Sequence, residues 1–169
     1  EYTSWKSNEE KNRNFKNLLK AQKEFGWNLL LNENDTISVD GNKIKVIGVE
    51  NWASSRFQQY GDLDKAYNGL DNEDFKILMT HNPSHWNAKV TDAYNDIDLT
   101  LSGHTHGLQY GIDIGDFRVS PVRLAYKQWA DLYELNKQYI YVNRGFGFMG
   151  YPGRVGILPE ITILELKKS

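Results

Sequence analysis

Apolar residues recur at helical spacing near the start of the chain and then in short, strand-like runs. Ser7 and Glu10 have the spacing of a capping box, and apolar side chains follow at intervals of three and four residues up to Gly26. This pattern predicts one helix ending near Gly26. The apolar run 27–31 predicts a short strand. Segments 36–39 and 44–49 flank Asp40-Gly41-Asn42, which predicts a β-hairpin.

The rest of the chain alternates further strands and helices before it becomes rich in loops. The pattern predicts strands over 75–80 and 97–101, and helices over 64–70 and 83–93 with Pro83 in the first turn. Segments 132–135 and 139–142 flank Asn136-Lys137 and predict a second hairpin. The glycine-containing stretches 108–122 and 145–159 are predicted loops, and 161–166 is predicted to be a final strand.

This order of elements indicates a mixed α/β protein. Early strands alternate with helices and the end is rich in hairpins, which favours a mixed sheet over a purely parallel one. A length of 169 residues suits a single domain with its own core, and the sequence has no repeat or linker that divides it. We therefore expect residues 1–169 to form one structural unit.

Composition and charge exclude several classes of function. The net charge is −2 and the chain has no long basic run, so the electrostatic footprint of a nucleic-acid-binding protein is missing. Cysteine is absent, which excludes thiolate metal sites, disulfides and a cysteine nucleophile. No apolar run approaches the ~20 residues that span a bilayer. The chain begins at Glu1, which suggests a processed product or a fragment.

All four histidines lie in two short patches that follow predicted strands. His81 and His85 follow the strand 75–80, and His104 and His106 follow the strand 97–101 within Gly-His-Thr-His-Gly. Ligands of α/β sheets bind beyond the carboxyl ends of the strands, and imidazole is a common ligand of zinc, iron and manganese. The pattern predicts a metal site built from His81, His104 and His106. We expect His85, inside a predicted helix, to be structural.

Other polar and aromatic residues are weaker candidates. Asn143 and Arg144 end a predicted strand. The planar guanidinium of Arg144 can bind a phosphate through two hydrogen bonds, and a purely structural role for Arg144 agrees equally well with the sequence. The pair Glu50-Asn51 is expected at the same sheet edge, with a structural role favoured. The aromatic residues of the loops suit either a substrate rim or the core; they are Tyr126, Trp129, Phe146, Phe148 and Tyr151.

These motifs resemble the calcineurin-like metallophosphoesterases. The resemblance rests on Thr80-His81-Asn82-Pro83, on Gly103-His104-Thr105-His106-Gly107 and on Tyr141-Val142-Asn143-Arg144-Gly145, and it extends from about Ile47 onward. The last motif is similar to a small bacterial branch that is often membrane-anchored. The resemblance implies an α/β sandwich with two divalent ions, Mn, Fe or Zn, of which His81 and His104 would bind one and His106 the other. Such a pair of ions acidifies a water and polarises phosphoryl oxygens, so that phosphate monoesters, diesters or pyrophosphates are hydrolysed.

The first half of the family pattern is missing from residues 1–80. The Asp-x-His, Gly-Asp-x-x-Asp and Gly-Asn-His-Asp/Glu motifs, which would supply the bridging aspartate and the catalytic histidine, do not occur there. We therefore expect the chain to be the C-terminal part of a longer phosphoesterase domain and to be inactive alone. We also expect it to pair with its missing N-terminal half, or with itself, through an uncovered sheet. Any membrane anchor would lie in the absent upstream segment.

Two alternatives to a phosphoesterase remain at this point. One is a non-catalytic, metal-binding interaction module derived from the same fold. The other is a different metallohydrolase with a His-x-His motif, which is disfavoured because Leu108 and Gln109 stand where an aspartate and a further histidine would be required. The substrate class stays open, with a membrane-side pyrophosphate or lipid headgroup preferred, and the protein is expected to be bacterial, either cytoplasmic or membrane-associated.

Overall fold

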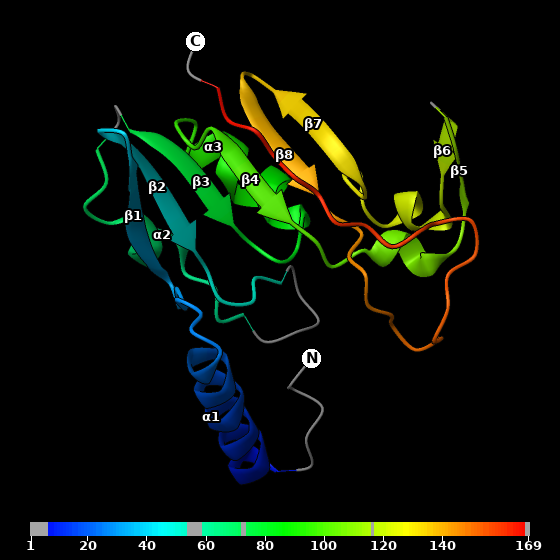
Figure 1. Ribbon diagram of the computed structural model, residues 1–169, viewed down its shortest axis with the longest axis horizontal. Helices are drawn as coiled ribbons and strands as arrows, with labels where there is room; N and C mark the ends of the chain where they lie inside the picture. The colour runs from blue at the N-terminus through cyan, green and yellow to red at the C-terminus, as the bar shows by residue number, and fades with distance from the viewer. Residues whose placement is uncertain (1–6, 54–58, 72–73, 116, 168–169) are drawn as a thin grey trace.

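A six-stranded mixed sheet forms the centre of the molecule. The computed structural model describes residues 7–53, 59–71, 74–115 and 117–167. The sheet order is β1-β2-β3-β4-β8-β7, with β2, β3, β4 and β8 parallel and the edge strands β1 and β7 antiparallel to their neighbours (Figure 1). The strands are β1 (Glu33–Val39), β2 (Asn42–Gly48), β3 (Phe75–Met79), β4 (Leu99–Ser102), β7 (Asp131–Leu135) and β8 (Gln138–Val142). The predicted mixed α/β fold and both hairpins are confirmed.

Short helical segments cover one face of this sheet. They are α2 (Leu63–Tyr67), the π-helical turn η1 (Trp86–Val90) and α3 (Thr91–Ala93), which together replace the longer predicted helix over 83–93. The core lies between these segments and alternate residues of the strands, because strand side chains point to opposite faces in turn. Its fully or almost fully buried members include Ile47, Leu63, Leu78, Trp86 and Ile140.

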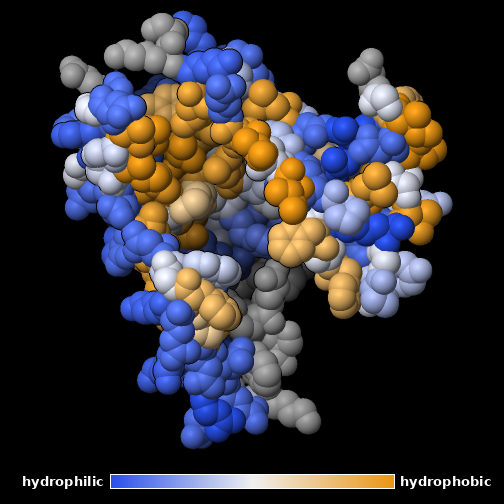
Figure 2. Space-filling view, in the orientation of Figure 1, coloured by the Kyte–Doolittle hydropathy of each residue, from blue (hydrophilic) through white to orange (hydrophobic). Residues whose placement is uncertain are grey.

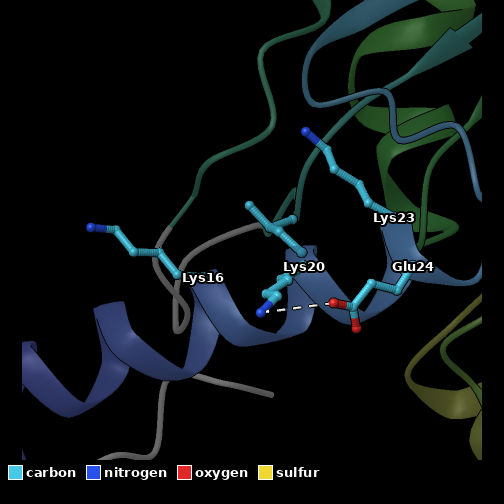
Figure 3. Close-up of a pocket in the computed structure, with 5 residues that line it drawn as sticks. Lys16, Lys20, Lys23 and Glu24 are labelled. Carbon is cyan, nitrogen blue, oxygen red and sulfur yellow. Dashed lines mark ion pairs between the residues drawn. The ribbon is translucent and has the colours of Figure 1, made fainter.

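The long helix α1 (Asn8–Glu24) projects away from the sheet (Figure 1). It begins as predicted, because the Ser7 hydroxyl accepts a hydrogen bond from the Glu10 N–H at 3.2 Å. Every residue of α1 is at least partly exposed. Its outer side carries a shallow hollow of about 450 Å³ lined by Lys16, Leu19, Lys20, Lys23 and Glu24. Figure 3 shows the lysine side chains spread over this surface, with one ion pair between Lys20 and Glu24 at 3.8 Å.

The second face of the sheet is apolar and largely uncovered. Strand register places Phe75 beside Ile44, Met79 beside Leu101, and Tyr139 beside Leu99, all on the face opposite the core. Phe75, Met79 and Tyr139 are 37–39% exposed. Figure 2 shows hydrophobic residues gathered over the strands on this side of the molecule. The sequence led us to expect an uncovered sheet without indicating which face, and pairing through this face stays a prediction.

Two predicted strands and one predicted loop are wrong. Residues 27–31 pair with no described strand and so form none; Leu30 packs directly on Gly48, where the absence of a Cβ leaves room for it. Residues 161–166 form no strand either: they run over β8, and Thr162 bonds Asn143 at 2.9 Å (Figure 1). The stretch 108–122, predicted as a loop, contains a small hairpin of β5 (Ile112–Ile114) and β6 (Phe117–Val119).

Within the part of the chain that the structure describes, no helix combines the length and the apolar character needed to cross a membrane.

Candidate metal centre

Two of the three predicted metal ligands lie side by side at the carboxyl edge of the sheet. His81 follows β3 and His104 follows β4, and these strands are parallel neighbours, so both histidines emerge at the same edge. Their ring centroids are 5.0 Å apart and the rings meet edge to face at 74°. The backbone N–H of Gly103 donates to the His81 carbonyl at 3.0 Å, which ties the two loops together. The two histidines therefore lie at one sheet edge as expected, and their role as metal ligands stays a prediction.

Tyr126 orients His104 from a distant part of the chain. Its hydroxyl lies 2.9 Å from Nε2 of His104, and the two rings also meet edge-on at 5.5 Å. A hydrogen bond to one imidazole nitrogen fixes the ring orientation and selects which nitrogen faces a ligand. Sequence analysis named Tyr126 only as a loop aromatic, because nothing in its spacing links it to a residue 22 positions earlier.

The backbone of the second histidine patch adopts left-handed conformations. His104 and His106 have φ of 70° and 51°, and Leu108 and Gln109 in the turn η2 (His106–Gln109) have φ of 54° and 58°. Each such non-glycine residue costs roughly 1–2 kcal/mol, and such residues concentrate at functional sites. We take this run of left-handed residues as support for a functional role of the patch.

Buried hydroxyl groups hold this conformation in place. Thr105 donates to the carbonyl of Trp129 at 2.7 Å, and Ser120 donates to the carbonyl of Gly107 at 2.7 Å. Gly107 itself has φ of +57°, and a Cβ there would lie 2.8 Å from a side-chain carbon of Ile157. The loop that carries His106 is thus fixed from three sides.

The described residues do not complete a metal site. No group of three or more His, Asp or Glu side chains in the described ranges is arranged to hold a metal ion, so His106 does not join the pair of His81 and His104 in a preformed cluster. Three imidazoles suit zinc, iron or manganese by their chemistry, but a dinuclear centre also needs a bridging carboxylate. The donor set thus fits one part of such a centre, and no reaction step is assigned to these residues alone.

A cleft of about 220 Å³ opens beside His81. The side of α1 that faces the domain provides its apolar wall, and Glu50, Asn51 and Tyr60 lie on the other side with His81. Asn32 fixes Glu50 by donating to its carboxylate at 2.9 Å and by accepting from its backbone N–H at 3.1 Å. The pair Glu50-Asn51 therefore lies at the expected sheet edge and shares a cleft with His81, although the sequence favoured a structural role for it.

Arg144 is held between two carboxylates. Its guanidinium donates to Glu160 at 2.6 Å and to Asp113, and its side chain is 10% exposed. Burial alone would raise the pKa of Glu160, but hydrogen bonds from Thr162, Tyr141 and Arg144 outweigh it and hold that pKa below its usual range. These contacts describe a structural anchor, and substrate binding by Asn143 and Arg144 stays a prediction.

His85 is separated from the other histidines by its surroundings. It is fully buried, stacks on Trp52 at 4.7 Å and lies 3.0 Å from the Thr80 hydroxyl through Nδ1. Burial, helped by the nearby positive charge of Lys89, lowers the pKa of His85 from 6.5 to about 4. This environment agrees with the structural role expected from the sequence.

The depressed pKa of His85 predicts a specific loss of stability in acid. The unfolded chain takes up this proton near pH 6.5 while the folded chain stays neutral down to about pH 4, so stability is fully present above pH 6.5 and falls as the pH drops. Between about pH 7 and about pH 4.5 the free energy of unfolding of the wild-type chain should fall by about 2 kcal/mol more than that of His85→Gln. Urea unfolding at both pH values measures this difference, and parallel stability profiles would show that His85 is not held neutral.

Comparison with known proteins identifies the family. The family model of the calcineurin-like phosphoesterases matches residues 2–108, a stretch that contains both histidine patches. The chain belongs to this family, which confirms the resemblance and the α/β fold expected from it. Members of the family are phosphoesterases, which are hydrolases, and they generally use divalent metal ions.

Individual relatives agree with this assignment. The chain is 32% identical over 157 residues to the uncharacterized metallophosphoesterase YkuE of Bacillus subtilis, covering 92% of this chain and 51% of that protein. It is 35% identical over 148 residues to the uncharacterized metallophosphoesterase Cj0846 of Campylobacter jejuni, covering 86% and 36%. It is 34% identical over 117 residues to a Danio rerio transmembrane protein with a metallophosphoesterase domain, covering 68% and 25%. The chain thus spans about half the length, or less, of these relatives. No solved structure matches it.

Proposed function

We propose that this chain is the C-terminal part of a longer metal-dependent phosphoesterase domain. In this proposal His81, His104 and His106 are ligands of a dinuclear Mn, Fe or Zn centre that hydrolyses phosphate mono- or diesters or pyrophosphates. The observation that carries it is the ring contact of His81 and His104, 5.0 Å apart at the carboxyl edge of adjacent parallel strands. The left-handed backbone at His104 and His106 supports it independently.

The proposal includes inactivity of the chain on its own. Three imidazoles supply neither a bridging carboxylate nor a histidine for proton transfer, and the described residues form no cluster that holds a metal. A bridging aspartate and a catalytic histidine would come from the upstream part of the domain. The rival hypothesis, a metal-binding interaction module without catalysis, makes the same prediction for the isolated chain but a different one for the full-length protein.

Turnover of bis(p-nitrophenyl) phosphate with added Mn²⁺ separates these possibilities. We expect the full-length protein to hydrolyse it and the isolated chain to show less than about a hundredth of that rate. Losing even a hydrogen-bond partner of a metal ligand lowers activity or metal affinity about 10–100-fold, and the isolated chain lacks whole ligands. Comparable turnover by the isolated chain would contradict the proposed incompleteness. An inactive but metal-loaded full-length protein would instead favour the interaction module.

We also propose that an upstream segment builds a second layer over the open sheet face. Phe75, Met79 and Tyr139 are exposed on that face, and an apolar sheet of this kind normally packs against another layer. The segment 161–166 runs over β8 with Ile161 and Ile163 exposed by 84% and 93%. Its apolar character suits a strand of this second layer, whose neighbouring strands would come from the upstream half.

Self-association of the isolated chain tests the open face. We expect light scattering at high concentration to show dimers or larger species, because the same apolar face then pairs with a second copy. Phe75→Lys with Met79→Lys should return the chain to a monomer. Leu124→Lys, at an 89% exposed position away from the sheet, should leave the association unchanged. A strictly monomeric wild-type chain would argue against an uncovered docking face.

A further inference from the structure

A second exposed apolar surface lies at the other end of the molecule, beside the loop that carries His106. The loop after β8 exposes Phe146, Phe148 and Tyr151 by 78%, 63% and 65%, and Met149 between them by 55%. Figure 2 shows hydrophobic residues around the β5–β6 end of the molecule, set apart by polar residues from those over the sheet. Clusters of exposed aromatic side chains mark contact surfaces more often than accidental exposure.

This aromatic loop is held rigid although its side chains bury little surface. The buried Gln109 donates to the carbonyls of Tyr151 at 2.7 Å and Gly153 at 2.5 Å, and it accepts from the Met149 N–H. Arg154 donates to the carbonyl of Gly147 at 2.9 Å. A loop fixed in this way has little conformational entropy left to lose when it binds, which is the property of a preorganised contact surface.

The loop is connected to the histidine patch. Arg154 also donates to the carbonyl of Arg144 at 2.9 Å and to that of His106 at 3.4 Å. Gln109 is the last residue of the turn η2 that begins at His106. Whatever the aromatic loop contacts is therefore held next to the candidate metal centre.

An apolar hollow with a cation beside it extends the same surface. Tyr110 pairs with Val155 in a β-bridge, which joins the aromatic loop to the β5–β6 hairpin. Next to this bridge is a hollow of about 410 Å³, lined mainly by Tyr110, Ile112, Val119 and Leu124, with Arg123 among its walls. Leu124 is 89% exposed and Tyr110 58%.

The charges around this surface favour an anionic partner. The described carboxylates of this end are engaged in ion pairs: Asp113 and Asp131 with Arg118, and Asp113 and Glu160 with Arg144. Arg123, which lines the hollow, is exposed. Exposed aromatic and aliphatic side chains next to an exposed cation are typical of proteins that bind the surface of an anionic lipid bilayer.

We propose that the aromatic loop (residues 146–151) and the adjoining Tyr110–Leu124 hollow form a docking surface for the interface of an anionic lipid bilayer. The aromatic and methionine side chains enter the headgroup region, and Arg123 faces lipid phosphates. The histidine-bearing edge of the sheet is then held close to the membrane surface. This inference does not depend on phosphoester hydrolysis, so the two proposals fail separately.

Site-specific fluorescence on the chain tests the docking surface. Because the chain contains no cysteine, Phe148→Cys and Met79→Cys each give a single position for an environment-sensitive dye. With vesicles of phosphatidylglycerol and phosphatidylcholine, we expect the dye at position 148 to shift to the blue and brighten, and the dye at position 79, on the open sheet face, to stay unchanged. An unchanged dye at 148, or a larger response at 79, would overturn the proposal.

Co-sedimentation with the same vesicles provides the matched variants. Phe146→Ser with Phe148→Ser should weaken binding at least about tenfold, because two large apolar side chains are no longer transferred from water into the bilayer. Ile161→Ser with Ile163→Ser, which removes two equally exposed apolar side chains elsewhere, should not. Equal losses in both double variants would contradict a bilayer-specific surface. Equal binding to phosphatidylcholine alone would do the same, and so would a response of the dye at position 148 to protein concentration without lipid.

Discussion

Replacing His104 by alanine in the full-length protein is expected to abolish metal-dependent phosphodiester hydrolysis. His104 lies in ring contact with His81 and is oriented by the Tyr126 hydroxyl at 2.9 Å. Outer-shell partners of metal ligands alone contribute 10–100-fold, so loss of a ligand should lower kcat/KM by more than about 100-fold. Metal content, measured by atomic emission on the same preparation, should fall with the activity.

Two further variants give this prediction its controls. Tyr126→Phe removes only the orienting hydroxyl and should cost about 10–100-fold, with the fold intact. His85→Gln removes a buried imidazole that stacks on Trp52 away from the ligand pair, and it should leave kcat/KM near the wild-type value at neutral pH. An active His104→Ala protein with full metal content would exclude His104 as a ligand.

Removal of Arg144 should cause the largest loss of folding stability among single substitutions near the site. Its side chain, 10% exposed, bonds Glu160 and Asp113 at once, and those carboxylates are themselves only 10% and 16% exposed. Arg144→Ala leaves Glu160 without its cation and leaves Asp113 with Arg118 alone, and breaking a buried pair in this way costs about 3–5 kcal/mol. Urea unfolding of the isolated chain measures the change, with Arg123→Ala as the exposed control expected within about 0.5 kcal/mol.

The same substitution, made in the full-length protein, distinguishes a structural from a substrate-binding arginine. A structural anchor predicts a destabilised protein whose residual folded fraction keeps its KM. If Arg144→Ala instead retains wild-type stability and raises KM alone, Arg144 contacts the substrate, and the anchoring role assigned to its two ion pairs is wrong.

Those parts of the fold that depend on local pattern could be predicted from the sequence. The Ser7–Glu10 capping box marked the start of α1, and β3 and β4 were found because each is a short apolar run bounded by turn residues. The order of these elements was enough to place His81 and His104 at one sheet edge, since parallel neighbours end together.

The errors arise where a segment needs a partner that is distant in the sequence. Residues 161–166 have strand-like composition, yet strand formation requires a neighbouring strand to share hydrogen bonds, and here the segment bonds through side chains such as Thr162 to Asn143. The strands β5 and β6 contain three residues each, too few for an alternation to be visible among glycines.

Side-chain partners of the site were equally hidden from the sequence. Tyr126 reaches His104 across 22 residues, and Asn32 fixes Glu50 across 18. The three-sided support of the His106 loop depends on the hydroxyls of Thr105 and Ser120, which are ordinary loop residues by sequence. Only the folded backbone brings such pairs together.

Anomalous scattering from crystals of the Mn²⁺-loaded full-length protein tests the central claim most directly. We expect two peaks at the carboxyl edge of β3 and β4, with ring nitrogens of His81, His104 and His106 about 2.0–2.3 Å from a metal ion. Full-length crystals that place manganese elsewhere, or that leave these three imidazoles without a metal, would contradict it.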